Sequence, residues 1–282
     1  MKRSTDRILT THVGSLVRPS GLVELMRAKD HGQPYDQQEL ATRVRSAVRD
    51  VVQQQVEAGV DIPSDGEYGK PSFSGYVNER LSGFERRPRD PNESPLLNWG
   101  RDRQLFREFY EEYDRATGSA SGYPVVCTGP ITYQGQAAVQ SDIAIFKAAL
   151  AGLHPAEAFI PAVAPGTIEL QRRDTYYPTD EAYLFAIAEA MREEYRAIVD
   201  AGFVLQLDDP RVVTQYGMPD PAPSIADYRK FAELRVEAIN HAAGGHSVGP
   251  STVPPVLGEL AWAACHRCAA EGHCGHRVAG AR

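Results

Sequence analysis

The chain has 282 residues, of which 42% are hydrophobic and 24% charged, a composition typical of a folded globular protein. Its 30 basic and 37 acidic side chains give a net charge of -7, which offers no electrostatic attraction to nucleic acid or to an anionic membrane. The expected partner is therefore a small molecule. No apolar run is long enough to span a membrane, and the first residues lack the apolar segment of a secretory signal, so a cytoplasmic location is expected.

Between residues 8 and 243, short apolar runs alternate with longer amphipathic segments. The expected strands are residues 8–13, 60–62, 123–127 and 203–207, with a fourth in chain order that opens at 158–160 and ends near 164–166. The expected helices are residues 40–58, 103–113, 180–201 and 225–241. This alternation indicates a parallel sheet whose carboxyl strand ends share one face. The polar stretch at residues 71–122 is expected to be an insertion or a lid.

Polar and turn-forming residues follow each expected strand, at residues 11–15, 64–67, 128–130, 165–166 and 208–210. This distribution predicts an α/β protein of the TIM-type (β/α)8 barrel class, in which the active site is built at the carboxyl strand ends. An open doubly wound sheet is the alternative, less favoured because no glycine-rich phosphate fingerprint follows a strand. Five strands by residue 210 correspond to about 42 residues per unit, whereas eight such units need about 340 residues. The barrel is therefore expected to be truncated after five to six units.

Four stretches resemble the cobalamin-independent methionine synthase family, especially its short, single-barrel members. They are Thr10–Pro19, Glu57–Glu67, Thr128–Thr132 and Leu205–Pro210. The resemblance implies a methyltransferase of methionine biosynthesis, with homocysteine as the thiol and 5-methyltetrahydrofolate, as its polyglutamate, as the methyl donor. It also implies zinc as the cofactor, because a bound metal ion lowers the pKa of the thiol and supplies a thiolate that attacks the methyl group.

The resemblance places three substrate-binding residues on this sequence. Ser15 and Glu67 would hold the amino-acid end of the thiol substrate, and Asp208 would anchor its ammonium group. No catalytic residue is assigned. From the residues alone, simpler interpretations stay open: Ser15 as a turn hydroxyl, Glu67 in a solvated turn, and Asp208 and Asp209 as a helix N-cap followed by Pro210.

Three further side chains near the expected strand ends allow other interpretations. His12 is equally well interpreted as a satisfied, partly buried side chain or as a site residue. Cys127 is expected to pack within its apolar strand. Arg18 is expected to form a surface ion pair, with a role in holding a substrate carboxylate as the alternative.

The zinc ligands of the family are a His-x-Cys pair, a Glu and a second Cys, all downstream of the fifth strand. None has a match in this sequence, so no metal ligand is assigned, and the chain as written is expected to be inactive. After residue 243 the sequence loses its periodicity and becomes rich in Gly, Ala, Pro, His and Cys. Back-translation from Gly245, read one nucleotide later, permits a family-like continuation that encodes His-Leu-Cys across Pro254–Leu257.

These observations predict two parts: an incomplete methionine synthase-like catalytic barrel at residues 1–243 and a non-native, out-of-frame tail at residues 244–282. The competing interpretation of the tail is a zinc knuckle, because Cys265 and Cys268 have Cys-x-x-Cys spacing, with Cys274 and His276 nearby.

Three functional alternatives stay open. One is a related zinc alkyltransferase that joins an epoxide to coenzyme M. The second is a metal-free decarboxylase related to uroporphyrinogen decarboxylase, and the third is a fragment without catalysis. The oligomeric state is left open.

Overall fold

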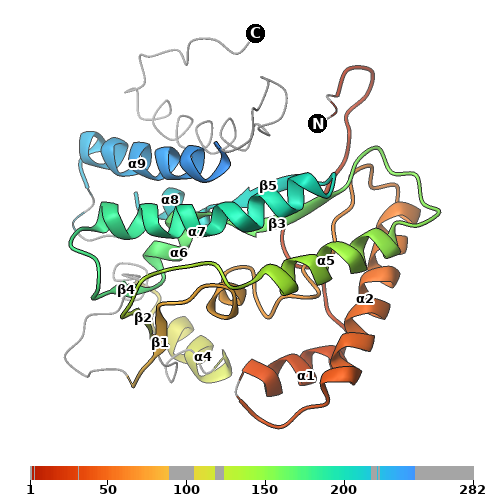
Figure 1. Cartoon of the computed structure of the whole chain (residues 1–282), viewed down its shortest axis with the longest axis horizontal. Coiled ribbons are helices and arrows are strands. Elements are labelled where there is room, and N and C mark those ends of the chain that lie inside the picture. The colour runs from red at the N-terminus through yellow and green to blue at the C-terminus, as the bar shows by residue number, and fades with distance from the viewer. Residues whose placement is uncertain are drawn as a thin grey trace.

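The computed structural model describes residues 2, 4–30, 32–88, 105–117, 124–216, 221 and 223–244 (Figure 1). The proposed out-of-frame tail, apart from Gly244, lies outside these residues, and so does its zinc-knuckle spacing. The helices are α1 (Ser20–Asp30), α2 (Gln37–Glu57), η1 (Gly75–Glu79, a 3-10 helix), α4 (Arg107–Thr117), α5 (Gln136–Ala149), α6 (Pro165–Leu170), α7 (Asp180–Asp200), α8 (Pro210–Thr214) and α9 (Ile225–Ala243). The strands are β1 (Phe84–Arg86), β2 (Val125–Cys127), β3 (Phe159–Val163), β4 (Arg173–Asp174) and β5 (Val204–Asp208).

Four segments of the chain form a parallel series. β3 and β5 pair in parallel, from Phe159 opposite Val204 to Val163 opposite Asp208. Parallel bridges extend the series from Phe159 to Ser64 and from Ile62 to Thr11. Figure 1 shows β3 and β5 side by side, with α7 lying along them. The carboxyl ends of all four segments therefore lie on one face, as the sequence predicted.

The predicted α/β organisation is confirmed, but the described residues do not show a closed (β/α)8 barrel. The predicted third strand is present as β2, yet it does not join the parallel series. It pairs antiparallel with β1 and parallel with β4. The reason is that β3 already occupies the place beside the second segment, where the Phe159 N–H donates to the Pro63 carbonyl at 3.1 Å.

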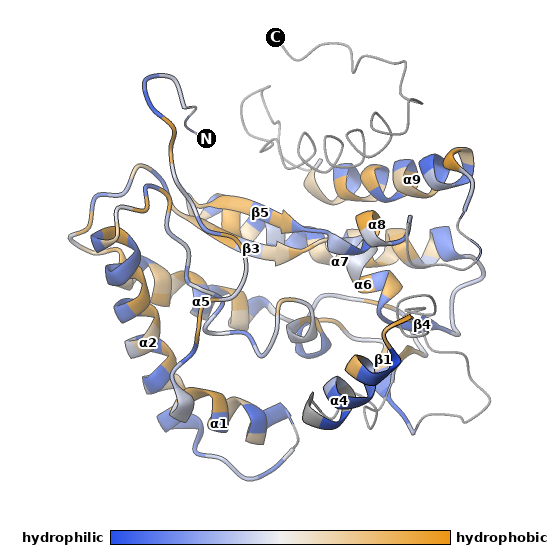
Figure 2. Cartoon of the chain, turned by 180° about the vertical axis from the view of Figure 1, so that it is seen from behind, coloured by the Kyte–Doolittle hydropathy of each residue, from blue (hydrophilic) through white to orange (hydrophobic). Residues whose placement is uncertain are grey.

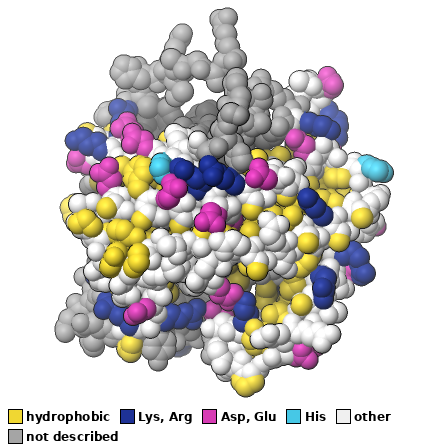
Figure 3. All heavy atoms as spheres, in the orientation of Figure 1, with side chains coloured by type: hydrophobic (Ala, Val, Ile, Leu, Met, Phe, Trp, Pro, Cys, Tyr) yellow, Lys and Arg dark blue, Asp and Glu magenta, His cyan; other side chains and the backbone are white. Residues whose placement is uncertain are grey.

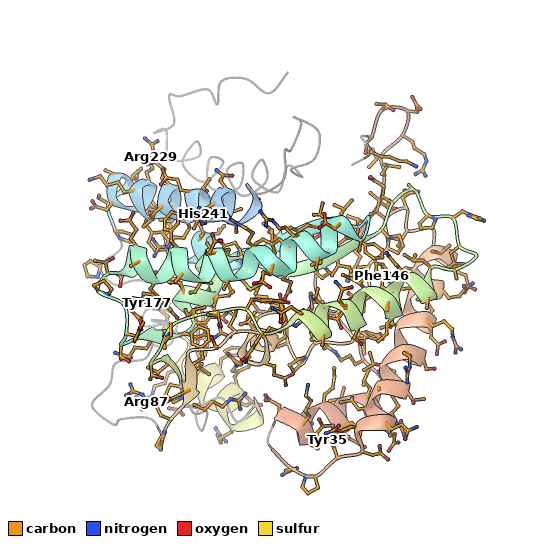
Figure 4. All side chains as sticks on the ribbon, in the orientation of Figure 1. Tyr35, Arg87, Phe146, Tyr177, Arg229 and His241 are labelled. Atoms are coloured by element: carbon orange, nitrogen blue, oxygen red, sulfur yellow. The ribbon has the colours of Figure 1, made fainter. Side chains whose placement is uncertain are left out.

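The core lies between the parallel series and the helices that cover it. The buried face of α2 is a stripe of valines at helical spacing: Val44, Val48, Val51 and Val52. Figure 2 shows the apolar character of β3 and β5 and the two-sided colouring of the helices around them. On α5, the Phe146 ring stacks on Phe203 with centroids 4.9 Å apart (Figure 4). The ring contact joins α5 to the residue that precedes β5.

Helix α9 packs against α7, and His241 of α9 lies 2.7 Å from Glu189 of α7 (Figure 4).

The face shown in Figure 3 carries acidic and basic side chains interspersed, with no large area of one sign. Within the described ranges, no helix is both long and apolar enough to cross a membrane.

Candidate functional site

A pocket of about 470 Å³ opens where the carboxyl ends of the parallel segments meet. Its lining residues come from the first, second and last of these segments and from one turn between them: Val13, Gly14, Ser15, Glu67, Phe73, Gln206, Leu207, Asp208, Asp209 and Pro210. All three predicted substrate-binding residues therefore lie on one pocket, although they are up to 193 residues apart in sequence. Their predicted roles stay predictions.

Glu67 has an unusual backbone and an unusual carboxylate. Gly66 and Glu67 have φ angles of 65° and 60°, and Glu67 is the one non-glycine residue with positive φ among those described. Its side chain is 1% exposed. The Ser15 hydroxyl donates to Oε2 at 2.5 Å, whereas the buried Oε1 has no hydrogen-bond partner. The carboxylate thus keeps a free acceptor oxygen, which is costly unless a ligand donates to it.

The turn that carries Glu67 is anchored to helix α2. The side-chain amide of Gln55 donates to the Ser64 carbonyl at 2.8 Å, and the Ser64 N–H donates back to Gln55 Oε1 at 3.0 Å. Ser64 Oγ then accepts the Gly66 N–H at 3.2 Å, and Asp65 Oδ1 accepts the Glu67 N–H at 2.9 Å. These hydrogen bonds fix Ser64–Glu67 as a buried turn. The interpretation of Glu67 as part of a solvated turn is therefore wrong.

Two consecutive aspartates, the last residue of β5 and the residue after it, complete the acidic side of the pocket. Asp208 accepts a hydrogen bond from Gln206 Nε2 at 3.0 Å, and burial raises its pKa. Asp209 is 3% exposed and accepts from Thr167 Oγ1 at 2.7 Å, while its Oδ2 is buried without a partner. Burial raises the pKa of Asp209 to about 6. Asp209 also precedes α8 as its N-cap residue, with Pro210 first in the helix, as one interpretation of the sequence predicted.

The pocket is acidic and otherwise mainly apolar. Val13, Phe73 and Leu207 supply apolar surface, and no Lys, Arg or His is among its described lining residues. The buried Lys70 is not a lining residue. Its ammonium donates to the Pro161 carbonyl and lies 4.6 Å from the Tyr76 ring centroid. Such a pocket suits a ligand that carries an ammonium group beside an apolar chain, since buried carboxylates are stabilised by a charged donor.

The described residues do not fit a zinc ion. Among them, no group of three or more His, Cys, Asp or Glu side chains is arranged to hold a metal ion. Cys127 is buried, as predicted, and its thiol donates to the Gly129 carbonyl at 3.4 Å. Burial raises the pKa of this thiol to about 11, which opposes the thiolate form that a metal requires.

The structure corrects the expectation for Arg18 and adds residues that the sequence did not indicate. Arg18 donates to the backbone carbonyls of Glu67 and Lys70, at 2.8 and 2.9 Å, and is partly buried. It therefore does not form the expected surface ion pair.

His12 is partly buried, with Nε2 2.6 Å from the Gly14 carbonyl, and is not a lining residue. Phe73 lies in the predicted insertion, where no sequence signal marked it.

Comparisons with known proteins agree with the resemblance found in the sequence. No family model matches the chain. The methionine synthase of Sulfolobus acidocaldarius is 28% identical over 240 residues, which are 85% of this chain and 58% of that protein. The methionine synthase of Pyrococcus horikoshii is 24% identical over 84% of this chain and 58% of its own length. The chain thus spans somewhat more than half the length of these curated relatives.

The fold is also similar to that of a solved methionine synthase. The B12-independent methionine synthase from Shewanella sp. W3-18-1, determined in complex with selenomethionine, aligns with a TM-score of 0.60 and 20% identity. The alignment covers 84% of this chain and 58% of the Shewanella chain. At this identity the likeness concerns the fold. The predicted resemblance to cobalamin-independent methionine synthases is therefore confirmed in sequence and in fold.

Proposed function

We propose that the pocket binds homocysteine by its ammonium group and that the fold serves methyl transfer to the homocysteine sulfur, giving methionine. One observation carries the proposal: two buried carboxylate oxygens, Glu67 Oε1 and Asp209 Oδ2, lack partners on a pocket whose described lining has no basic side chain. An ammonium group would supply the missing charge and donors, with Asp208 as a further acceptor.

The uncharged part of homocysteine also suits the pocket. Its two methylenes and its thiol would lie against the apolar surface of Val13, Phe73 and Leu207. Support comes from the names of the relatives, which are methionine synthases, and from the selenomethionine bound to the Shewanella protein. Ser15 would orient the Glu67 carboxylate, because its hydroxyl already occupies Oε2 and leaves Oε1 for the ligand.

The charge of the pocket favours an amino-acid thiol over the two other enzymatic alternatives. Coenzyme M carries a sulfonate and no ammonium, so Glu67, Asp208 and Asp209 would repel it. Uroporphyrinogen carries several carboxylates and would meet the same repulsion. Homocysteine also carries a carboxylate, but it is the one candidate of the three with a cationic group, and that group matches these acids.

The proposed methyl donor is methyltetrahydrofolate and the proposed cofactor is zinc, both from the family resemblance. Since the described residues do not fit zinc, no step of methyl transfer is assigned to them. We therefore propose that the 282-residue chain binds the thiol substrate but does not complete the reaction. Metal analysis of the purified chain and a methylation assay with homocysteine test this, with less than one zinc ion per ten chains and no methionine expected. Stoichiometric zinc together with methionine formation would contradict it.

Binding to two conservative variants tests the proposed role of the carboxylates. We expect Glu67→Gln and Asp208→Asn each to weaken homocysteine binding roughly tenfold or more, because each replaces a charge-assisted hydrogen bond by a neutral one. Isothermal titration calorimetry at pH 7.5 measures the change in Kd. The matched control is Glu24→Gln, an exposed acid on α1, which should leave the Kd unchanged. Unchanged affinity in both pocket variants would refute the proposed role.

A further inference from the structure

We propose that Arg18 is a positioning residue, which acts on the substrate through Glu67 by holding the left-handed turn that presents the Glu67 carboxylate to the pocket. This inference rests on the proposed function insofar as the carboxylate binds an ammonium group. Arg18 itself is not among the lining residues of the pocket, so it is not assigned a contact with substrate.

The first carboxyl-end segment, Ser15–Arg18, and the turn that carries Glu67 are joined residue by residue. Besides the Ser15–Glu67 hydrogen bond, the Leu16 N–H donates to the Gly66 carbonyl at 3.2 Å. The hydroxyl of Tyr68 donates to the Val17 carbonyl at 2.5 Å. The two segments therefore form one unit, although about 50 residues separate them in sequence.

Arg18 completes this unit at the place where the backbone is most strained. One nitrogen, Nη2, donates to the carbonyls of both Glu67 and Lys70, at 2.8 and 2.9 Å. Glu67 is the strained residue, and Lys70 ends the turn that follows it. A non-glycine residue with positive φ is strained, and it persists only where neighbouring contacts fix it. A charged donor shared by two carbonyls is such a contact.

The surroundings of Arg18 exclude the simpler roles. Among the described residues, no carboxylate oxygen forms an ion pair with its guanidinium. The carboxylate of Glu67 instead accepts a hydrogen bond from Ser15. The hydrogen bonds of Arg18 to Glu67 are therefore made to the main chain, while its charge also acts on the Glu67 carboxylate. Its effect on a ligand should pass through that one side chain.

A double-mutant cycle on homocysteine binding tests this. We expect Arg18→Met to raise the Kd roughly tenfold in the full chain, measured by isothermal titration calorimetry. In the Glu67→Gln background the same substitution should change the Kd less than twofold, because the carboxylate that Arg18 places is already gone. Arg18→Lys should restore part of the affinity, since an ammonium can donate to the same carbonyls. Equal losses in both backgrounds would overturn the proposal.

Hydrogen exchange without ligand separates this inference from the proposed function. In Arg18→Met, amide exchange should accelerate at residues 66–70 and stay unchanged in α2 and α7, whereas the control Arg49→Met on the exposed face of α2 should alter neither. If the unsubstituted chain binds no homocysteine, the proposed function fails and this exchange pattern decides the role of Arg18. Unchanged exchange at residues 66–70 would overturn it, as would acceleration spread over the whole chain.

Discussion

The acidic side chains of the pocket are buried at a cost that the protein itself does not offset. Glu67 and Asp209 each keep one unpartnered carboxylate oxygen, and Glu67 also has a left-handed backbone. Buried polar groups are normally satisfied, and such exceptions concentrate where a ligand completes the set of contacts. Ser15 and Thr167 satisfy only the other oxygen of each acid. Both unpartnered oxygens belong to residues that line the same pocket.

Asp209 predicts a dependence of stability on pH. Its pKa is about 6 in the folded chain and near 4 when unfolded, so the folded chain binds more protons between these values. The contribution of Asp209 to stability is therefore full below about pH 4 and is lost as the pH rises through 6. The hydrogen bonds from Thr167 and from the Val212 backbone and the charge of Arg235 act to lower this pKa, but burial outweighs all three.

We expect Asp209→Asn to flatten this dependence, because an amide does not ionise. The fall in the free energy of unfolding between pH 4.5 and pH 7.5 should be smaller in the variant, by roughly 2 kcal/mol. Urea denaturation at both pH values measures the difference. The exposed control Asp50→Asn should follow the unsubstituted chain. An identical pH dependence in Asp209→Asn would contradict the assignment.

The positions of Ser15, Glu67 and Asp208 could be predicted to lie together, because parallel segments carry their carboxyl ends to one face. The contacts of Arg18 could not be predicted. They depend on two backbone carbonyls that approach only after the turn at Gly66 and Glu67 adopts positive φ angles. Asp209 was interpreted as a helix cap, since local sequence does not show that Thr167 lies beside it.

At the scale of elements, one buried acid of α7, Glu194, links this helix to side chains near η1 and before α5. Glu194 is 0% exposed and accepts hydrogen bonds from the hydroxyls of Tyr76 and Tyr133, both at 2.8 Å. It also forms an ion pair with Arg80 Nη1 at 3.0 Å. Burial is the largest influence on Glu194 and acts to raise its pKa. The charges of Arg80 and Lys70 and the two tyrosine hydrogen bonds together outweigh burial, so the pKa lies below its usual value. The chain around η1 is therefore fastened to α7 by charge and by hydrogen bonds together.

We expect Glu194→Gln to lower the free energy of unfolding by roughly 3 kcal/mol, because it leaves the buried Arg80 with Asp142 as its remaining acid. Urea denaturation followed by circular dichroism measures this. The control is Glu189→Gln on the same helix, whose partners Arg192 and His241 form exposed pairs, and its effect should stay within about 0.5 kcal/mol. A loss as small as that of the control would show that Glu194 is dispensable.

The long helices were predicted nearly to their ends, because an apolar stripe at helical spacing continues through α2, α7 and α9. Helix α5 was missed. Its apolar residues do not form a narrow stripe, since both α2 and α7 pack against it. The pairing of β2 with β1 and β4 was also missed, because strand partners are set by contacts distant in sequence.

At the scale of the whole molecule, the parallel series brings distant segments to one acidic pocket. Residues 13–15 from the first segment, Glu67 from the turn after the second and residues 206–210 at the end of β5 meet there. The same chain matches curated methionine synthases over most of its own length and 58% of theirs. The unpartnered carboxylates of the pocket and the names of the relatives support the same proposal independently.

The central claim is that the pocket recognises an ammonium group on a thiol-bearing chain. Calorimetric titration of the chain with homocysteine and with 4-sulfanylbutanoic acid, which has the same thiol and carboxylate but no amino group, tests it most directly. We expect homocysteine to bind at least tenfold more tightly, because the analogue leaves the carboxylates of Glu67 and Asp209 without a donor. Equal or tighter binding of the analogue would contradict the account.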